Sequence, residues 1–192
     1  MSENASLISN SYSTGSITTG DSTSYIGGLV GLNADIGSSA SIISSYASGN
    51  IFTGDSNSYI GGLVGLNANV GSIASITTSY ATGNITAGYS NSYIGGLVGL
   101  NANSGSTASI STSYASGSIN AGNKSLYVGG LVGVNGNGGS TSSITNSYST
   151  GNLLTGSNGS YIGGLVGING NGGSTSSITN SFFRPFSGNC YF

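Results

Sequence analysis

Short apolar runs interrupted by glycine recur along the chain at a constant interval. The segment Ile-Gly-Gly-Leu-Val-Gly-Leu-Asn at residues 26–33 returns, with small changes, at Ile60, Ile94, Val128 and Ile162, so each step is 34 residues. A Ser-Tyr pair keeps the same step from residues 11–12 onward. No insertion or deletion interrupts the pattern, which predicts a tandem-repeat protein whose units pack on their neighbours.

Composition favours strands over helices. A period of 34 is also typical of helix-pair repeats, but the chain contains 36 Gly and only 3% charged residues. Each Gly in a regular element costs ~0.5–1 kcal/mol relative to Ala, so helical repeats of this composition are unfavourable. Ile, Val, Thr and Tyr between Gly and Asn instead predict about three short strands per unit, near residues 25–33, near 42–48 and near Ile51.

A unit of this size cannot bury an apolar face alone, whereas stacked units place equivalent residues ~4.8 Å apart and build a continuous core. The sequence therefore predicts an all-β fold, a parallel β-solenoid (β-helix) of about 5.5 coils with 34 residues per coil. Residues 1–181 are expected to form one solenoid. Residues 182–192 depart from the repeat and are expected to be a C-terminal cap or tail.

Alternation in the first strand predicts which columns face the core. Ile26, Gly28, Val30 and Leu32 would lie on the core side, with Tyr25 and Leu29 on the opposite side. That opposite side is a candidate assembly stripe: Tyr25, Leu29, Tyr59, Leu63, Tyr93, Leu97, Tyr127, Leu131, Tyr161 and Leu165. A bulge at the flanking glycines would instead redirect the Leu column inward, and the sequence leaves both arrangements open.

The second strand carries a conflict of parity. In a regular strand Ile42, Ser44 and Tyr46 would face the same side, so burying Ile42 would also bury the polar Ser44. A kink after Ile42 would place Ser45 and Ala47 inward and Tyr46 outward, and this arrangement is favoured over an internal Tyr stack. The outward residues form a candidate contact face: Tyr46, Thr78, Tyr80, Thr82, Thr112, Tyr114 and Tyr148.

Charge excludes several classes of function. Two basic residues cannot form a nucleic-acid interface, because phosphate binding depends on clustered Lys and Arg. The apolar runs are shorter than the ~20 residues that a membrane span requires, so no span is expected. Residues 1–4 show neither a basic nor an apolar signal-peptide region.

Few side chains could support catalysis or bind a metal. Asp21 and Asp55 occupy one column and could form a carboxylate dyad or a cation site. The same column continues with Tyr89 and Asn123, so a solvated turn is the favoured interpretation. Cys190 has no partner for a disulfide or a zinc site and is expected to be an unremarkable terminal residue. The expectation is a protein that is not an enzyme and has no cofactor or metal.

The repeat resembles a known family, the GLUG repeats, through Gly28-Leu29-Val30-Gly31 and the segment at residues 76–85. The resemblance covers about residues 5–183. Many members carry Cys before the Tyr of the second strand, where this chain has Ser. The resemblance implies a tandem module of secreted or surface-displayed microbial proteins, some of them adhesin-like, and hence an extracellular or cell-surface location. It carries over no catalytic residue.

Two functions compete at this level. The leading hypothesis is a structural or adhesive surface module that self-associates into oligomers or fibres, through open sheet edges or through the Tyr and Leu ladders. A net charge of −2 offers little repulsion between copies. The alternative is ice binding by a flat Ser/Thr face, although the Thr78 column also contains Asn10 and Asn146. Expected partners are a second copy, a host surface, a glycan or ice.

Overall fold

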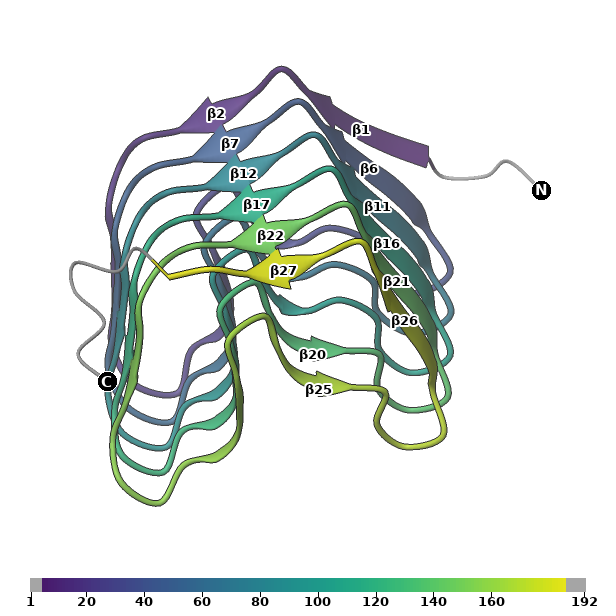
Figure 1. Ribbon diagram of the computed structural model, residues 1–192. Coiled ribbons are helices and arrows are strands. Elements are labelled where there is room, and N and C mark those ends of the chain that lie inside the picture. The colour runs from purple at the N-terminus through teal and green to yellow at the C-terminus, as the bar shows by residue number, and fades with distance from the viewer. Residues whose placement is uncertain (1–4, 186–192) are drawn as a thin grey trace.

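The computed structural model describes residues 5–185, which form 27 β-strands and no helix. Every strand pairs in parallel with the strand one repeat away, which gives five sheets that run the length of a rod (Figure 1). The structure confirms the predicted all-β solenoid with one 34-residue unit per coil.

Each coil contributes one strand to each sheet. Sheet A contains β1 (Ala5–Ser9), β6 (Ser39–Ile43), β11 (Ile73–Thr77), β16 (Thr107–Ser111), β21 (Thr141–Thr145) and β26 (Thr175–Thr179). Sheet B contains β2 (Tyr12–Ser13), β7 (Tyr46–Ala47), β12 (Tyr80–Ala81), β17 (Tyr114–Ala115), β22 (Tyr148–Ser149) and β27 (Phe182–Phe183). Figure 1 shows these two sheets meeting at a ridge along the rod.

The other three sheets close the coil. Sheet C contains β3 (Ile17–Thr19), β8 (Ile51–Thr53), β13 (Ile85–Ala87), β18 (Ile119–Ala121) and β23 (Leu153–Thr155). Sheet D contains β4 (Ser24–Gly27), β9 (Ser58–Gly61), β14 (Ser92–Gly95), β19 (Leu126–Gly129) and β24 (Ser160–Gly163). Sheet E contains β5 (Val30–Leu32), β10 (Val64–Leu66), β15 (Val98–Leu100), β20 (Val132–Asn135) and β25 (Val166–Asn169).

The main core consists of columns of identical or similar apolar side chains. Ile42, Ile76, Ile110 and Ile144 are fully buried and pack against the Val and Leu columns of sheet E and its corner. A second cluster joins sheets C and D, with Ile51, Ile60, Ile85 and Ile94 fully buried. Burying each such side chain contributes ~1.5–3 kcal/mol, so stability resides in the stack of coils and not in any one of them.

The ridge between sheets A and B is a backbone kink. Ser44 has φ +50°, and the equivalent residues Asn10, Thr78, Thr112, Asn146 and Asn180 are also left-handed. The kink lies two residues after Ile42 and places Ser45 and Ala47 in the interior, as the sequence predicts. The Ser45 hydroxyl is satisfied there, since it donates to the Ile43 carbonyl at 2.8 Å and accepts the Ser11 N–H at 3.1 Å.

The Leu half of the predicted assembly stripe is not exposed. Leu63, Leu97 and Leu131 are fully buried in the main core, and Leu29 and Leu165 pack against it from the end coils. The chain turns a corner here, because the N–H groups of both Leu29 and Val30 donate to the Leu63 carbonyl. Two consecutive side chains therefore point inward, which is the alternative that the flanking glycines left open. The Leu column cannot serve as an assembly surface.

The Tyr half of that stripe has a different environment. All five of its Tyr residues are left-handed, with φ from +53° to +58°. Tyr59, Tyr93 and Tyr127 lie over a third buried cluster formed by Leu66, Leu100 and Val134. The Leu32 column was expected to join the central core, but it packs under these Tyr rings. The corner at Leu29 and Val30 lies between the Tyr and Leu32 columns and interrupts the alternation on which that expectation depended.

Polar ladders run along the rod beside the apolar columns. The side-chain amide of Asn67 donates to Asn101 at 2.9 Å, and Asn101 donates to Asn135 at 2.8 Å, with all three buried. A second amide ladder connects Asn69, Asn103 and Asn137 at 2.9–3.0 Å. Each amide is donor to one neighbour and acceptor from the other, which satisfies groups whose isolated burial would be costly.

The last coil ends with aromatic side chains. Phe182 and Phe183 continue sheet B in register with Tyr148 and Ser149. Phe183 occupies the column of small Ala and Ser residues, and its ring lies against Gly164. Residues from Phe186 onward, including Cys190, lie outside the described residues, as do residues 1–4. The predicted cap is therefore described only as far as residue 185.

A charge in a central coil should unfold the stack. Ile110→Asp places an unpaired carboxylate in a fully buried column, and we expect it to lower the free energy of unfolding by several kcal/mol. Thr107→Asp on the same strand is the matched control, because Thr107 is exposed. Thermal denaturation followed by circular dichroism measures both. Equal melting temperatures for the two variants would contradict a core at this column.

Candidate functional site

A ladder of aromatic rings runs along the outside of sheet B. It consists of Tyr12, Tyr46, Tyr80, Tyr114, Tyr148 and Phe182, and is called the outer ladder below. Successive ring centroids are 4.9–5.2 Å apart and successive planes differ by at most 8°. The parallel register of sheet B imposes this spacing, because each Tyr pairs with the Tyr of the next coil.

The predicted contact face is brought together at this ladder. Thr78 and Thr112 are exposed at the kink that precedes the Tyr residues, and Thr82 is exposed immediately after β12. All seven predicted residues thus lie on the outer surface near one ridge. The surface is not the flat face expected for ice binding, because the kink bends the backbone at every coil (Figure 1).

Stacking decides what the outer ladder can offer a partner. Each interior ring covers the face of its neighbour, so the ladder presents ring edges and phenol hydroxyls at a regular interval. Burial, and after it the neighbouring phenols Tyr80 and Tyr148, raises the pKa of Tyr114. The Tyr114 hydroxyl is therefore neutral at physiological pH and can both donate and accept hydrogen bonds.

A second Tyr stack, the inner ladder, lies on sheet D and comprises Tyr25, Tyr59, Tyr93, Tyr127 and Tyr161. Its centroids are 4.8–5.2 Å apart. Its three central members are half-buried over the Leu66 cluster, while Tyr25 and Tyr161 are exposed. Burial, followed by the coulombic effect of adjacent Tyr residues, raises the pKa of Tyr59 and of Tyr93. The inner ladder is mainly a packing element.

Sheet A carries an outward surface that the contact-face prediction missed. Its inward columns are Ala40 and Ile42 and their equivalents, so the residues between them face outward. In the last three coils these outward residues, the hydroxyl face, are all Ser or Thr: Thr107, Ser109, Ser111, Thr141, Ser143, Thr145, Thr175, Ser177 and Thr179. The repeated Thr-any-Ser pattern was the signal that could have identified it.

The carboxylates of the Asp21 column accept hydrogen bonds from backbone N–H groups of the next coil. Asp21 Oδ1 accepts the N–H of Asp55 at 2.8 Å, and Asp55 Oδ1 accepts the N–H of Tyr89 at 2.7 Å. Asn123 does the same for Ser157 at 2.9 Å. These contacts agree with the expected exposed turn. Within residues 5–185 no group of three or more His, Cys, Asp or Glu lies together.

One cation lies beside this column. Lys124 Nζ is 5.2 Å from the centroid of the Tyr89 ring. A hydrogen bond with Tyr89, together with their coulombic interaction, raises the pKa of Lys124. The pair is exposed, so it is a surface contact between adjacent turns and not a catalytic arrangement.

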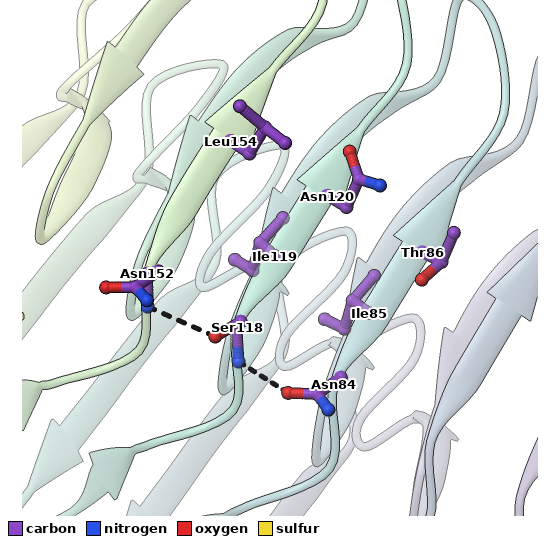
Figure 2. Close-up of a pocket in the computed structure, with 8 residues that line it drawn as sticks. All are labelled: Asn84, Ile85, Thr86, Ser118, Ile119, Asn120, Asn152 and Leu154. Carbon is purple, nitrogen blue, oxygen red and sulfur yellow. Dashed lines mark hydrogen bonds between the residues drawn. The ribbon is translucent and has the colours of Figure 1, made fainter. Parts of the chain in front are cut away.

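A shallow depression lies on the outside of sheet C, across β13, β18 and β23 (Figure 2). Its polar edge is already hydrogen-bonded, since Asn84 Oδ1 accepts the Ser118 N–H at 2.8 Å and Ser118 Oγ accepts the Asn152 N–H at 3.3 Å. Ile85, Thr86, Ile119, Asn120 and Leu154 complete the lining, and none of the lining residues is titratable. The depression lacks the groups that acid–base chemistry requires.

The family model of the GLUG motif matches residues 56–86, 90–120, 125–153 and 158–184, more than half of the chain. The chain belongs to the GLUG family. Its Gly-Leu-any-Gly segment is the corner between sheets D and E, where glycine permits close approach: a Cβ on Gly62 would lie 2.1 Å from the Gly96 carbonyl oxygen. No curated protein and no solved structure matches the chain.

The GLUG coils are built without helices over the described range, and no helix there is long and apolar enough to cross a membrane. The side chains that this chain presents to solvent lie in its outward columns. These are the outer ladder, the hydroxyl face and the variable columns of sheet C.

The Asp column gives a test of its structural role. Asn keeps the Oδ1 acceptor and already occupies this column at Asn123, so Asp21→Asn with Asp55→Asn should leave the free energy of unfolding unchanged. Asp55→Ala removes the acceptor for Tyr89 and should cost about 1 kcal/mol or less. Chemical denaturation of the two variants measures the difference. A loss of hydrolytic activity in the Asn variant would instead reveal a catalytic dyad.

Proposed function

We propose that this chain is a non-catalytic structural module that associates side by side with copies of itself through the outer ladder. The observation that supports this function is the uninterrupted stack of six aromatic rings on the outside of sheet B. The proposal extends the predicted self-association but assigns it to the Tyr46 column alone, because the Leu29 column is buried.

Matched periodicity favours a second copy as the partner. Two rods present the same ring interval of 4.9–5.2 Å, so a contact in register at one coil is in register at every coil. The same principle makes stacked identical strands associate through interdigitated side-chain ladders. A glycan fits less well, because sugars pack on aromatic faces and the interior faces of this ladder are covered by neighbouring rings.

Size and charge are compatible with this contact. Five intervals of ring spacing give a ladder ~25 Å long, close to the edge length of a standard interface that buries ~800 Å² per partner. The outward residues that flank the ladder are Ser, Thr and Asn, except for Arg184 in the last coil, and the net charge is −2. Little electrostatic repulsion opposes association, and Arg184 at the last coil is the charged side chain in the columns beside the ladder.

Absence of catalysis and a location outside the cell are parts of the same proposal. The first is supported by the use of Asp21 and Asp55 as backbone acceptors. The second is supported by the resemblance to surface-displayed GLUG modules. A rigid, nearly uncharged rod suits display and association better than turnover.

Charges on the outer ladder should prevent association. Tyr80→Lys with Tyr114→Lys places two like charges on the proposed contact, and we expect the variant to sediment as a monomer at micromolar concentrations at which the parent forms oligomers. Thr86→Lys with Asn120→Lys is the matched control on exposed positions of sheet C. Sedimentation velocity across a salt series measures both. A parent that remains monomeric throughout would contradict side-by-side association.

Ice binding is a second candidate, and the hydroxyl face is the observation that favours it. Its three Thr/Ser rows lie on five-residue strands in register, with outward residues ~6.6 Å apart along each strand and ~4.8 Å apart between strands. Such an array can hold water molecules at fixed positions. Leu7, Ile43 and Ile73 interrupt it toward the N-terminal coils.

Ice binding predicts a different variant profile. Ser109→Lys with Ser143→Lys disrupts the middle column of the hydroxyl face, and inhibition of ice recrystallisation should be lost if that face binds ice. The outer-ladder Lys variant serves as the control and should retain the inhibition. A monomeric parent that inhibits recrystallisation would favour this second function over self-association, and a parent without inhibition would eliminate it.

A further inference from the structure

We propose that the outer ladder is a site of oxidative cross-linking, at which tyrosines of neighbouring copies are joined as dityrosine. The inference rests on the proposed side-by-side contact, since that contact brings two outer ladders together. It adds a covalent modification to that contact.

The composition directs oxidation to tyrosine. The chain has 12 Tyr but no Trp and no His, and its single Met and single Cys are Met1 and Cys190. Residues 5–185 therefore contain no sulfur or indole side chain that would compete for a one-electron oxidant. The aromatic phenols are the groups in the rod that lose an electron most readily.

Geometry distinguishes the two ladders. Tyr12 is 65% exposed and the next four outer-ladder Tyr are partly exposed on the surface of sheet B, whereas the central inner rings are half-buried over Leu66 and its equivalents. Loss of an electron from a phenol is accompanied by loss of its proton, which needs an accessible acceptor such as water. The outer ladder meets this requirement along its whole length, and the inner ladder meets it at its two ends.

Stacking makes each outer ladder act as a unit. Rings with nearly parallel planes and centroids 4.9–5.1 Å apart are in contact, so a phenoxyl radical on one ring can take an electron from the next ring, while water returns a proton to the first oxygen and accepts one from the second. Neighbouring rings of one ladder cannot couple, because their corresponding carbons are held far beyond bonding distance by the same stacking. A radical thus persists within the ladder until it meets a radical on another copy.

The reaction balances with a peroxide-dependent one-electron oxidant. Two phenols each give up one electron and one proton, and the two phenoxyl radicals form a carbon–carbon bond between positions ortho to oxygen. The ring hydrogens at those positions move to the oxygens, which restores both phenols. The two electrons and two protons reduce one hydrogen peroxide to two waters.

The test treats the purified chain with a haem peroxidase and hydrogen peroxide. We expect dimers that survive denaturing electrophoresis, dityrosine fluorescence, and linked peptides that map by mass spectrometry to outer-ladder tyrosines. Replacing Tyr12, Tyr46, Tyr80, Tyr114 and Tyr148 together by Phe should abolish nearly all covalent dimer. Phe182 already stacks in this column at 5.2 Å from Tyr148, so Phe is compatible with the fold.

Two matched variants separate ladder geometry from exposure alone. Tyr59, Tyr93 and Tyr127 together replaced by Phe should leave the cross-link yield unchanged. Tyr89→Phe removes a Tyr that is 41% exposed but belongs to neither ladder, and it too should leave the yield unchanged. Circular dichroism checks that each variant is folded.

The outcomes distinguish this inference from the proposed function. Sedimentation without peroxide reports association by itself. An associated parent that yields no dityrosine, or links that map mainly to Tyr89 or the inner ladder, would overturn the cross-linking site and leave association standing. Links confined to the outer ladder at dilutions where the rods are monomeric would support the site while contradicting stable association.

Discussion

Parallel pairing of identical coils is the constraint on which the rest of this structure depends. Each strand hydrogen-bonds to the strand 34 residues away, and the same offset connects the buried side-chain amides of Asn67, Asn101 and Asn135. An amide can be donor to one neighbour and acceptor from the next only if the same residue recurs at the same place. Equal coil length is therefore required, because a slip of one residue would reverse the facing of every strand.

This constraint explains how much of the fold could be predicted. The sequence shows which residues recur every 34 positions and therefore share a column. The solenoid, its coil length and the inward direction of the Ser45 and Ala47 columns were predicted from the residue types in these columns. The predicted inward or outward direction of side chains was wrong where the backbone leaves the strand conformation. At Leu29 a corner turns two consecutive side chains inward, and at Tyr25 the backbone is left-handed within the strand. A non-glycine residue with positive φ is uncommon, and alternation carries no signal for it.

The outer surface inherits the same periodicity, and this is what relates fold to function. The Tyr face was predicted because Tyr46 lies beside small interior residues. The hydroxyl face was not predicted, because Ser and Thr are frequent throughout the chain. It is identified by the inward direction of Ala40 and Ile42, which places the residues between them on the outside. No pairwise contact had to be known to find either surface. The facing of one residue in each column was sufficient to place all its equivalents.

The variety of residue types within an outward column indicates whether packing between coils restricts the side chain at that position. On sheet C one outward column reads Thr18, Phe52, Thr86, Asn120 and Leu154, so packing against neighbouring coils demands no particular side chain there. The outer ladder, also outward, is aromatic in all six coils. Ring stacking favours an aromatic residue in every coil, because replacing one ring removes a contact from both of its neighbours. Stacking alone, however, would be served equally by Phe, as Phe182 shows. The hydroxyl kept at the other five positions adds nothing to the ring contact and is the part of each ring that a partner or an oxidant meets.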